Sequence, residues 1–269
     1  MSIKKSESQQ YFEMIFTRSC GIPFRQIRKE EYEQTVITKQ QAEDFSQFLE
    51  NDIEPFYYKA LLSYIEAISS LENNLYSWAT VRLYYSVFYA IRAYLACRNV
   101  AILRAERRLF YIKAQEGEKF KKCKDQTDHK GTIYTLEKLF SDDDILCSNK
   151  IDGQDVYQWM MGKREEVNYK DIIFHDPCPP DFWEKIHVDL KSQSMKTIID
   201  KLVDDNWLYC FQEEYAILGI PTKRLIQTVD AIHRLGKTCN VDNIKQEFIN
   251  DFADRLSDNA KQALIIWNR

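Results

Sequence analysis

The chain has 269 residues, of which 45% are hydrophobic and 29% are charged, as is ordinary for a globular protein. Its formal net charge of −4 excludes a globally basic nucleic-acid-binding protein, although a local basic patch remains compatible with it. Only 7 Gly and 6 Pro supply turn signals. We therefore expect an all-α fold built from long helices rather than a β architecture.

The seven cysteines are scattered and odd in number, and they form no CxxC pair. This usage is typical of a reducing cytosol and argues against a disulfide framework and a zinc ribbon. The first ten residues, MSIKKSESQQ, lack the apolar segment of a signal peptide, and no run of 18 apolar residues occurs. We expect a soluble, cytoplasmic protein without membrane association, cofactor or metal.

Residues 1–55 are expected to form an N-terminal extension that packs on the main body or pairs with another chain. Residues 1–36 are polar and predicted to be irregular, apart from the aromatic stretch Tyr11–Phe16. Thr38 and Gln41 have the spacing of a capping box, which predicts the start of a helix. Glu54–Pro55 should end that helix, because the residue before a proline disfavours the α conformation.

Residues 56–205 are predicted to form a bundle of four to five helices. Apolar residues recur at helical spacing from Phe56 to Leu71, and a second long helix is expected from about Tyr76 to Cys97. A short polar break separates the two, so they should form an antiparallel hairpin.

Residues 98–131 carry many charges of both signs, which predicts a solvated helix and loop. The alternative is that the basic side chains of this segment contact phosphates. These side chains are Arg104, Arg107, Arg108, Lys119, Lys121 and Lys122.

Three further helices are expected in the bundle: one from Gly131, one after Gly153 that reaches Val167, and one from Phe182 to Leu202. Residues 206–269 are predicted to be a C-terminal helical extension of three or four short helices. Its breaks should lie at 219–221 and at Gly236, and a capping serine at 257 should precede the last helix.

One face of the predicted helix 76–97 carries two arginines and two tyrosines at i, i+3, i+7 and i+10. Arginines on an otherwise buried helix are costly unless they meet anions or water-filled space. The alternative is that the tyrosines belong to the core and the arginines form ion pairs with Glu165 or Glu166. The four residues of this face are Arg82, Tyr85, Tyr89 and Arg92.

A second polar face is predicted in the stretch REEVNY at 164–169, where Arg164, Asn168 and either Glu165 or Tyr169 lie on one side of a helix. An arginine can bind a phosphate through two hydrogen bonds and stabilise the charge that builds on it. A nearby tyrosine or asparagine can orient a hydroxyl group. We expect this face and the preceding one to meet and form the working site.

Three segments resemble motifs of the HEPN superfamily, and they occur in the family's order. WATVRLYYSVFYAIRAYL at 78–95 resembles its N-R-x-Y-Y-A-x-F-H-A-x-R-A-L-L helix. DHKGTIYTLEKLF at 128–140 is similar to its H-K-G helix start, and REEVNYKD at 164–171 is similar to its R-E-x-A-D-Y segment. The likeness is greatest to the small stand-alone HEPN group that is often paired with nucleotidyltransferases.

The resemblance implies a HEPN-like antiparallel helical bundle, a homodimer, and RNA as the ligand. Many HEPN proteins are metal-independent ribonucleases that act as toxins or in antiviral defence, with the active cleft between two protomers, and an antitoxin or other partner protein is then expected. The alternative is a catalytically inactive HEPN protein that binds RNA, a nucleotide or a partner protein. A third alternative is a structural subunit of a larger complex.

Carried over by position, the resemblance gives Arg164 the role of binding and polarising the scissile phosphate. Tyr169 stands at the earliest position open to the motif histidine, Asn168 replaces an aspartate, and Glu165 stands where many members have a polar residue. These four are the candidate catalytic residues. The candidate RNA-binding residues are Arg82, Tyr85, Tyr89, Arg92 and His129.

One departure from the family pattern bears on catalysis. The first histidine after Arg164 is His175, with ten residues between them, which exceeds the usual spacing of the motif. A general base works best with a pKa near neutrality, and tyrosine has an unperturbed pKa of about 10. Catalysis would then be weak, absent, or carried by His129 or His175.

Overall fold

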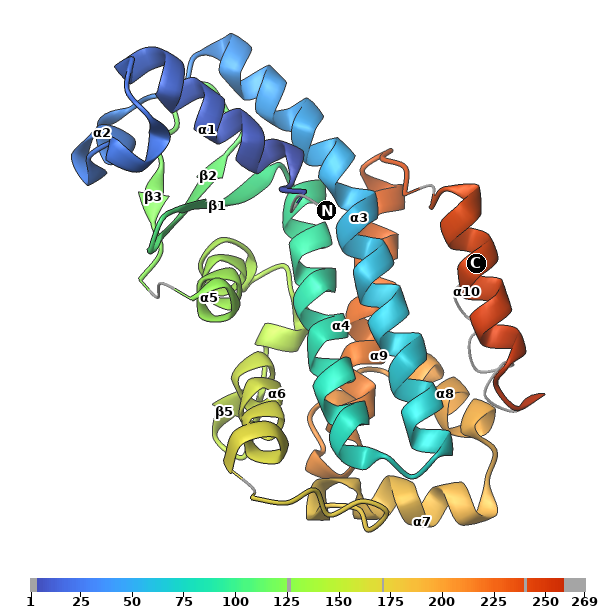
Figure 1. The fold of residues 1–269 in the computed structure, drawn as a ribbon. Helices are drawn as coiled ribbons and strands as arrows, with labels where there is room; N and C mark the ends of the chain where they lie inside the picture. The colour runs from blue at the N-terminus through green and yellow to red at the C-terminus, as the bar shows by residue number, and fades with distance from the viewer. Residues whose placement is uncertain (1–3, 125–126, 171, 240, 259–269) are drawn as a thin grey trace. The chain divides into compact units, whose positions relative to one another are not determined.

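The computed structural model describes residues 4–124, 127–170, 172–239 and 241–258 (Figure 1). Ten α-helices account for most of this described part of the chain, and its strands form only small antiparallel sheets. The expected mostly helical fold is confirmed. Within the same residues, no helix is both long enough and apolar enough to cross a membrane.

The chain divides into two compact units. Unit 1 comprises Met1–Tyr57, Ile91–Leu139 and Ala231–Cys239, and unit 2 comprises Tyr58–Ala90, Phe140–Asp230 and Asn240–Arg269. Two long helices, α3 (Lys39–Glu72) and α4 (Tyr76–Cys97), contribute residues to both units.

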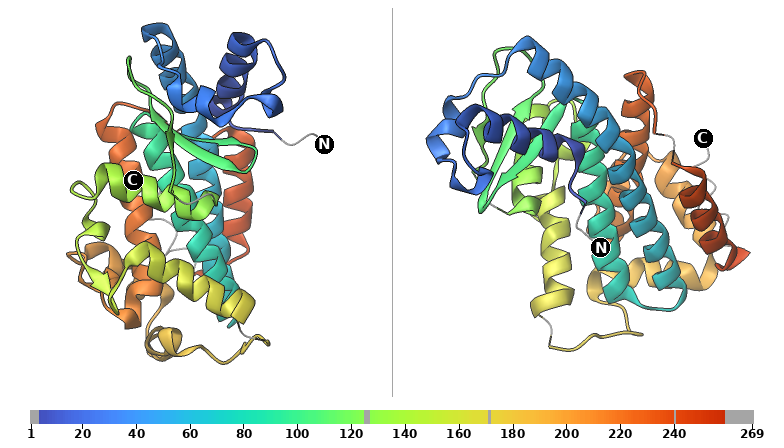
Figure 2. Two further views of the ribbon diagram at one scale, coloured as in Figure 1. Left: turned by 90° about the vertical axis from the view of Figure 1, so that its left-hand side faces the viewer. Right: turned by 45° about the horizontal axis from the view of Figure 1, so that its top comes forward.

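Unit 1 contains a three-stranded antiparallel sheet in the order β1-β2-β3, with helices on either side (Figure 2). The strands are β1 (Val100–Ala105), β2 (Arg108–Lys113) and β3 (Lys121–Lys122). The helices α1 (Glu7–Cys20) and α2 (Lys29–Gln34) belong to the same unit, as does α5 (Asp128–Phe140) except for its last residue.

The prediction that residues 1–36 are irregular is wrong, because most of this segment is helical. The side chain of Ser6 caps α1 by accepting a hydrogen bond from the backbone of Gln9 at 3.3 Å. Phe12 and Phe16 are fully buried, and both rings pack against Tyr32 of α2 at centroid distances of 5.5 and 4.7 Å. Aromatic packing of this kind stabilises a helix whose sequence is otherwise polar.

The prediction of a solvated helix and loop at 98–131 is also wrong. Short apolar runs at 100–103 and 109–112 are buried on both faces of the sheet, and the flanking charges mask this pattern in the sequence. The side-chain amide of Gln9 covers the edge of β1, because it donates to the Arg104 carbonyl and accepts from the Arg104 N–H, each at 2.8 Å.

Two of the basic side chains of this segment are neutralised by carboxylates. Arg104 pairs with Asp128 at 2.7 Å, and Lys121 pairs with Glu118 at 2.6 Å. No contact of this segment with a phosphate is therefore required to balance these two charges.

The capping box at the start of α3 is confirmed. The Gln41 side chain accepts from the Thr38 N–H at 2.9 Å, and the Thr38 hydroxyl accepts from the Gln41 N–H at 3.2 Å. The predicted end at Pro55 is wrong, because α3 continues to Glu72. Ile53 and Tyr57 are buried on either side of the proline, and this burial offsets the helix hydrogen bond that proline cannot donate.

Unit 2 is a helical bundle in which the α3–α4 hairpin packs against helices from later in the chain (Figure 1). The hydroxyls of Tyr64 and Thr222 lie 2.7 Å apart, and the Thr228 hydroxyl donates to the Ala90 carbonyl at 3.3 Å. The later helices are α6 (Val156–Glu165), α7 (Glu184–Ser192), α8 (Met195–Asp204), α9 (Glu213–Arg234) and α10 (Asn243–Asp254). Unit 2 also contains 3₁₀ turns at Ile145–Cys147, Asp181–Trp183 and Leu208–Cys210 and a small hairpin of β4 (Lys150–Ile151) and β5 (Gln154–Asp155), whereas the 3₁₀ turn Phe24–Gln26 belongs to unit 1.

Two predicted helix boundaries in unit 2 are wrong. The helix expected from Phe182 to Leu202 is divided, because the Ser194 hydroxyl caps α8 by accepting from the Thr197 N–H at 3.1 Å. Residues 219–221, which were predicted to interrupt the helices of this region, lie inside the continuous helix α9. A Cβ on Gly219 would meet the Tyr209 carbonyl oxygen at 3.2 Å, so this glycine permits close packing.

Gly236 has a φ of 65° just beyond the end of α9, as predicted for a helix break. The helix expected after Ser257 lies outside the described residues.

A buried ion pair ties α9 to the segment before α6. Arg224 donates to Asp144 at 2.8 Å, and both side chains are fully buried. The Tyr157 hydroxyl and the Gln227 amide also donate to Asp144, at 2.7 and 3.0 Å. Asp144 additionally caps the turn that follows it, because its side chain accepts from the Leu146 N–H at 3.2 Å.

Candidate functional site

Arg164, on the last turn of α6, is surrounded by aromatic rings in unit 2. Its side chain is buried, with 8% exposure. The guanidinium carbon lies 5.3 Å from the ring centroid of Tyr84, 5.8 Å from that of Tyr85 and 5.2 Å from that of Tyr169. Rings in this position attract a cation through their negative faces. Of the first predicted face, the structure thus brings Tyr85 to Arg164.

A π-helical turn brings Tyr169 to Arg164. In an α-helix, a residue five positions further on lies about 140° around the axis. Residues Glu166–Lys170 instead form a π-turn, which aligns residues five positions apart. The Tyr169 hydroxyl consequently accepts a hydrogen bond from Arg164 Nη2 at 3.2 Å. Such turns are rare and occur frequently at functional sites.

The hydrogen-bonding capacity of Arg164 is mostly unused. Its Nε is buried without a hydrogen-bond partner, and no carboxylate in the described part of the chain forms an ion pair with it. A guanidinium carries five N–H donors, and a buried charge without a counter-charge costs free energy. The arrangement is therefore suited to an anion that presents several acceptor oxygens.

Tyr84 and Tyr85 of α4 lie against Arg164, and Tyr89 lies one turn further along the helix. Tyr84 is buried, and this burial raises the pKa of its hydroxyl above the ordinary value, which keeps it neutral. Tyr85 and Tyr89 are half-buried, and their rings stack at a centroid distance of 6.0 Å and an angle of 25°. The Lys59 ammonium of α3 lies 5.3 Å from the centroid of Tyr89.

The structure does not place Arg82 with Arg164. Arg82 pairs with Glu66 at 2.9 Å, so the alternative of an ion pair with Glu165 or Glu166 is wrong for this arginine. Its exposed side chain instead lines a pocket of about 310 Å³ together with Trp78 and other residues of unit 2.

Arg92 and His129 belong to unit 1, whereas Arg164 belongs to unit 2. The guanidinium of Arg92 lies 4.7 Å from the centroid of Phe56 and donates to the Ile102 carbonyl at 3.4 Å. Burial lowers the pKa of Arg92 from its ordinary value. His129 is half-buried in the first turn of α5.

The remaining predicted residues flank Arg164 in sequence. Glu165 ends α6, Asn168 lies in the π-turn, and both are half-buried. Neither makes a hydrogen bond or ion pair to Arg164 among the described residues.

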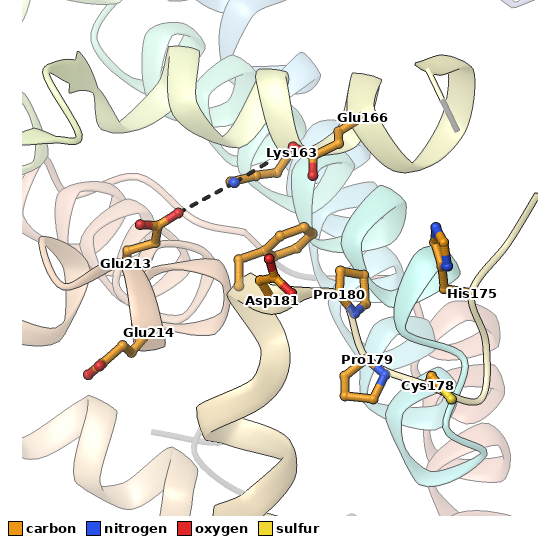
Figure 3. Close-up of a pocket in the computed structure, with 10 residues that line it drawn as sticks. Lys163, Glu166, His175, Cys178, Pro179, Pro180, Asp181, Glu213 and Glu214 are labelled. Carbon is orange, nitrogen blue, oxygen red and sulfur yellow. Dashed lines mark ion pairs between the residues drawn. The ribbon is translucent and has the colours of Figure 1, made fainter. Parts of the chain in front are cut away.

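A pocket of about 570 Å³ lies beside α6 in unit 2 (Figure 3). Lys163 points toward it and pairs with Glu213 at 3.4 Å and with Glu166 at 3.6 Å. Asp181 and Glu214 also line the pocket, so carboxylates outnumber its one lysine. This lining repels phosphate, so the pocket is not suited to an anion.

His175 lines the same acidic pocket, together with Cys178. In the described ranges, no group of three or more His, Cys, Asp or Glu side chains is arranged to hold a metal ion. The pocket therefore offers neither a phosphate site nor a metal site of that kind.

Sequence reasoning missed two neighbours of the site, Tyr84 and Lys59. Tyr84 falls on the apolar stripe of α4, so its contact with Arg164 is hidden by its role in the core. Lys59 lies on a different helix, and no sequence spacing relates it to Tyr89.

Comparison with known families gives a match over part of the chain. Residues 53–137 match the family model of the HEPN domain. The match ends before α6 and so does not include Arg164. No curated protein and no solved structure was found to match the chain.

Arg224 and Arg164 are both buried in unit 2, but we expect the same substitution to change the free energy of unfolding by different amounts at the two positions. Arg224→Met leaves the buried Asp144 without its cation and should lower the free energy of unfolding by about 3–5 kcal/mol. Arg164→Met removes a buried cation that has no carboxylate partner and should change it by less than about 1 kcal/mol, because the desolvation that is relieved offsets the ring interactions that are removed. Urea denaturation of both variants measures the difference. An equally large loss of stability in Arg164→Met would contradict a binding role and make Arg164 a structural residue.

Proposed function

The chain belongs to the HEPN superfamily, and we propose that it binds RNA by holding a backbone phosphate on Arg164. The observation that carries this proposal is the buried guanidinium of Arg164, whose Nε is unpartnered and which pairs with no carboxylate of the described residues. Phosphate oxygens accept the paired N–H donors of arginine with matching geometry. An RNA phosphate thus supplies both the charge and the acceptors that Arg164 lacks.

The aromatic surroundings of Arg164 favour RNA over a free phosphate. Tyr169 is 69% exposed although its hydroxyl is bonded to Arg164, so one face of its ring is accessible. Proteins recognise unpaired RNA bases largely by stacking them on aromatic side chains. A phosphate on Arg164 would place the adjoining base next to this ring.

We propose RNA cleavage without a metal ion as the further activity of this site. The 2′-hydroxyl would attack the neighbouring phosphorus and the bond from phosphorus to the 5′-oxygen would break, which gives a 2′,3′-cyclic phosphate and a 5′-hydroxyl that takes up the proton lost by the 2′-hydroxyl. Arg164 would stabilise the charge that develops on the phosphate oxygens. The Tyr169 hydroxyl is positioned to orient the attacking group. In this proposal the protein acts in the cytoplasm as a toxin or defence effector that an antitoxin protein restrains.

Binding without cleavage is the second candidate. It is favoured by the described contacts of Arg164, which are three tyrosines and include no histidine that could serve as a general base. Binding and cleavage make different demands on the Tyr169 hydroxyl, so one substitution separates them.

Arg164→Ala should weaken RNA binding by at least about tenfold, because it removes charge-assisted hydrogen bonds to a phosphate. Tyr169→Phe keeps the ring and should retain the affinity within about threefold, but it should abolish cleavage if the hydroxyl takes part. Fluorescence anisotropy measures affinity, incubation with total RNA in the presence of a chelator measures cleavage, and growth arrest on expression measures toxicity.

Arg255→Ala, at an exposed arginine after α10, is the matched control and should behave like the unmodified protein. Intact RNA with both the unmodified protein and Arg164→Ala would decide for binding without cleavage. Unchanged affinity in Arg164→Ala would contradict the proposed function altogether.

We also propose that a second copy of the chain covers the segment that follows Tyr169. Ile172 is 100% exposed, Ile173 is 66% exposed and Phe174 is 48% exposed. Consecutive exposed apolar side chains are typical of surfaces that another protein buries. Their place immediately after the π-turn would put the partner copy next to the Arg164 site.

Ile172→Lys combined with Ile173→Lys should convert this dimer into a monomer, because two charges cannot be buried in an apolar interface without partners. Size-exclusion chromatography with light scattering gives the mass of each form. Substitution of the exposed Ile244 by Lys, on α10, is the control. A monomeric unmodified protein, or an unaltered dimer in the double variant, would refute this interface.

A further inference from the structure

Unit 2 contains a small pocket where the end of α3, the start of α4 and the end of α10 meet. Its volume is about 310 Å³, at the lower end of the range for ligand pockets. Glu66 and Arg82 line it and pair with each other at 2.9 Å, so these two charges cancel. The other lining side chains are Ser70 and the apolar Leu75, Trp78 and Phe252. We call this surface the Trp78 pocket.

Core packing does not account for the apolar side chains of the Trp78 pocket. The buried side of α4 is formed by other residues, among them Ala79 and Leu83, which are fully buried. Trp78 is 44% exposed and Leu75 is 40% exposed, although tryptophan is highly buried on average. Grouped apolar side chains that stay exposed are typical of surfaces that another segment or protein covers.

The chain returns to the Trp78 pocket at Ser257, after α10. The Ser257 N–H donates to the Glu72 carboxylate at 3.4 Å, and its hydroxyl donates to the same carboxylate. Glu72 is the last residue of α3, where the helix dipole disfavours a negative charge and such donors are favourable. Leu75 is three residues from Glu72, so their Cα atoms lie at most about 11 Å apart. Ser257 is therefore held beside the pocket.

The sequence that follows Ser257 is apolar where the pocket would need it. Residues 259–269, NAKQALIIWNR, lie outside the described residues, and the five at 263–267 are all apolar. Seven residues lead from Ser257 to Leu264, and this length spans up to about 25 Å when extended. A short tether of this kind gives a segment an effective concentration in the millimolar range, so that even a weak contact is formed.

We propose that residues 263–267 bind in the Trp78 pocket of the same chain, with their apolar side chains against Leu75, Trp78 and Phe252. The occupant is the chain's own segment because it is tethered beside the pocket, whereas a second copy or another protein has to compete with it. The segment then fastens α10 to the α3–α4 hairpin, and a protein that binds this face has to displace it. The inference is independent of the proposed function, because it concerns a different surface and a different ligand.

The test uses ¹⁹F NMR of the full chain labelled with 5-fluorotryptophan. The resonances of Trp78 and Trp267 are assigned by their loss in Trp78→Phe and Trp267→Phe. In the unmodified protein both should differ from the resonance of the free amino acid. Both should also respond less than the free amino acid to a change from H₂O to D₂O, because the bound segment excludes water from the two rings.

One variant changes the segment and is observed at the pocket. Ile266→Asp should move the Trp78 resonance toward that of the free amino acid, because an aspartate cannot be buried among apolar side chains without a partner. Asn268→Asp adds the same charge two residues further on, outside 263–267, and is the matched control. It should leave the Trp78 resonance in place.

A second variant changes the pocket and is observed at the segment. Leu75→Lys, at a side chain that is 40% exposed, should move the Trp267 resonance toward the free value. Val188→Lys, at an exposed apolar residue of α7, is its control and should have no effect. Because the two variants lie on opposite sides of the contact, a folding defect in one would not remove the test.

An unmoved Trp78 resonance in Ile266→Asp, or an unmoved Trp267 resonance in Leu75→Lys, would overturn the inference. An equal mixture of these two variants identifies the occupant. Binding within one chain predicts that the mixture gives the sum of the two separate spectra. Recovery of the original Trp267 resonance in the mixture would show that the segment of a second copy fills the pocket, and binding within one chain would then be wrong.

Discussion

The guanidinium of Arg164 is held inside unit 2 by aromatic rings instead of by a carboxylate. Arg224 of the same unit differs, because it is fully buried and its charge is neutralised by Asp144 at 2.8 Å. Three weak ring contacts and one hydrogen bond keep Arg164 in place, but they leave its positive charge uncompensated. In the proposed function an anion balances this charge, and the tyrosines of α4 together with the π-turn hold the guanidinium in position for it.

The fold could be predicted from the sequence where local signals act alone. The capping box at Thr38, the α3–α4 hairpin and the break at Gly236 follow from short-range patterns. The failures occur where tertiary packing overrides such a pattern. Helix α3 continues through Pro55 because the residues on both sides of the proline are buried. Gly219 looks like a helix break in the sequence, but it is a glycine because a backbone carbonyl packs closely against it. The predicted domain boundaries at 55 and 205 stay predictions.

The candidate site could be predicted in part. Periodicity and family resemblance both indicated Arg164 and Tyr169, and the structure brings them together. Their contact depends on a π-turn, which no residue pattern in the sequence announces. The pairing of Arg82 with Glu66 and the position of Lys59 depend on how α3 lies beside α4, so spacing along one helix could not reveal them.

The role of Arg164 as the phosphate site is tested most directly by its Nε–H resonance in a ¹H–¹⁵N NMR spectrum, assigned by its absence in Arg164→Lys. We expect this resonance to shift when single-stranded RNA is added, because the unpartnered Nε–H then donates to a phosphate oxygen. RNA that binds, as anisotropy shows, while the resonance stays in place would contradict the claim that Arg164 holds the phosphate.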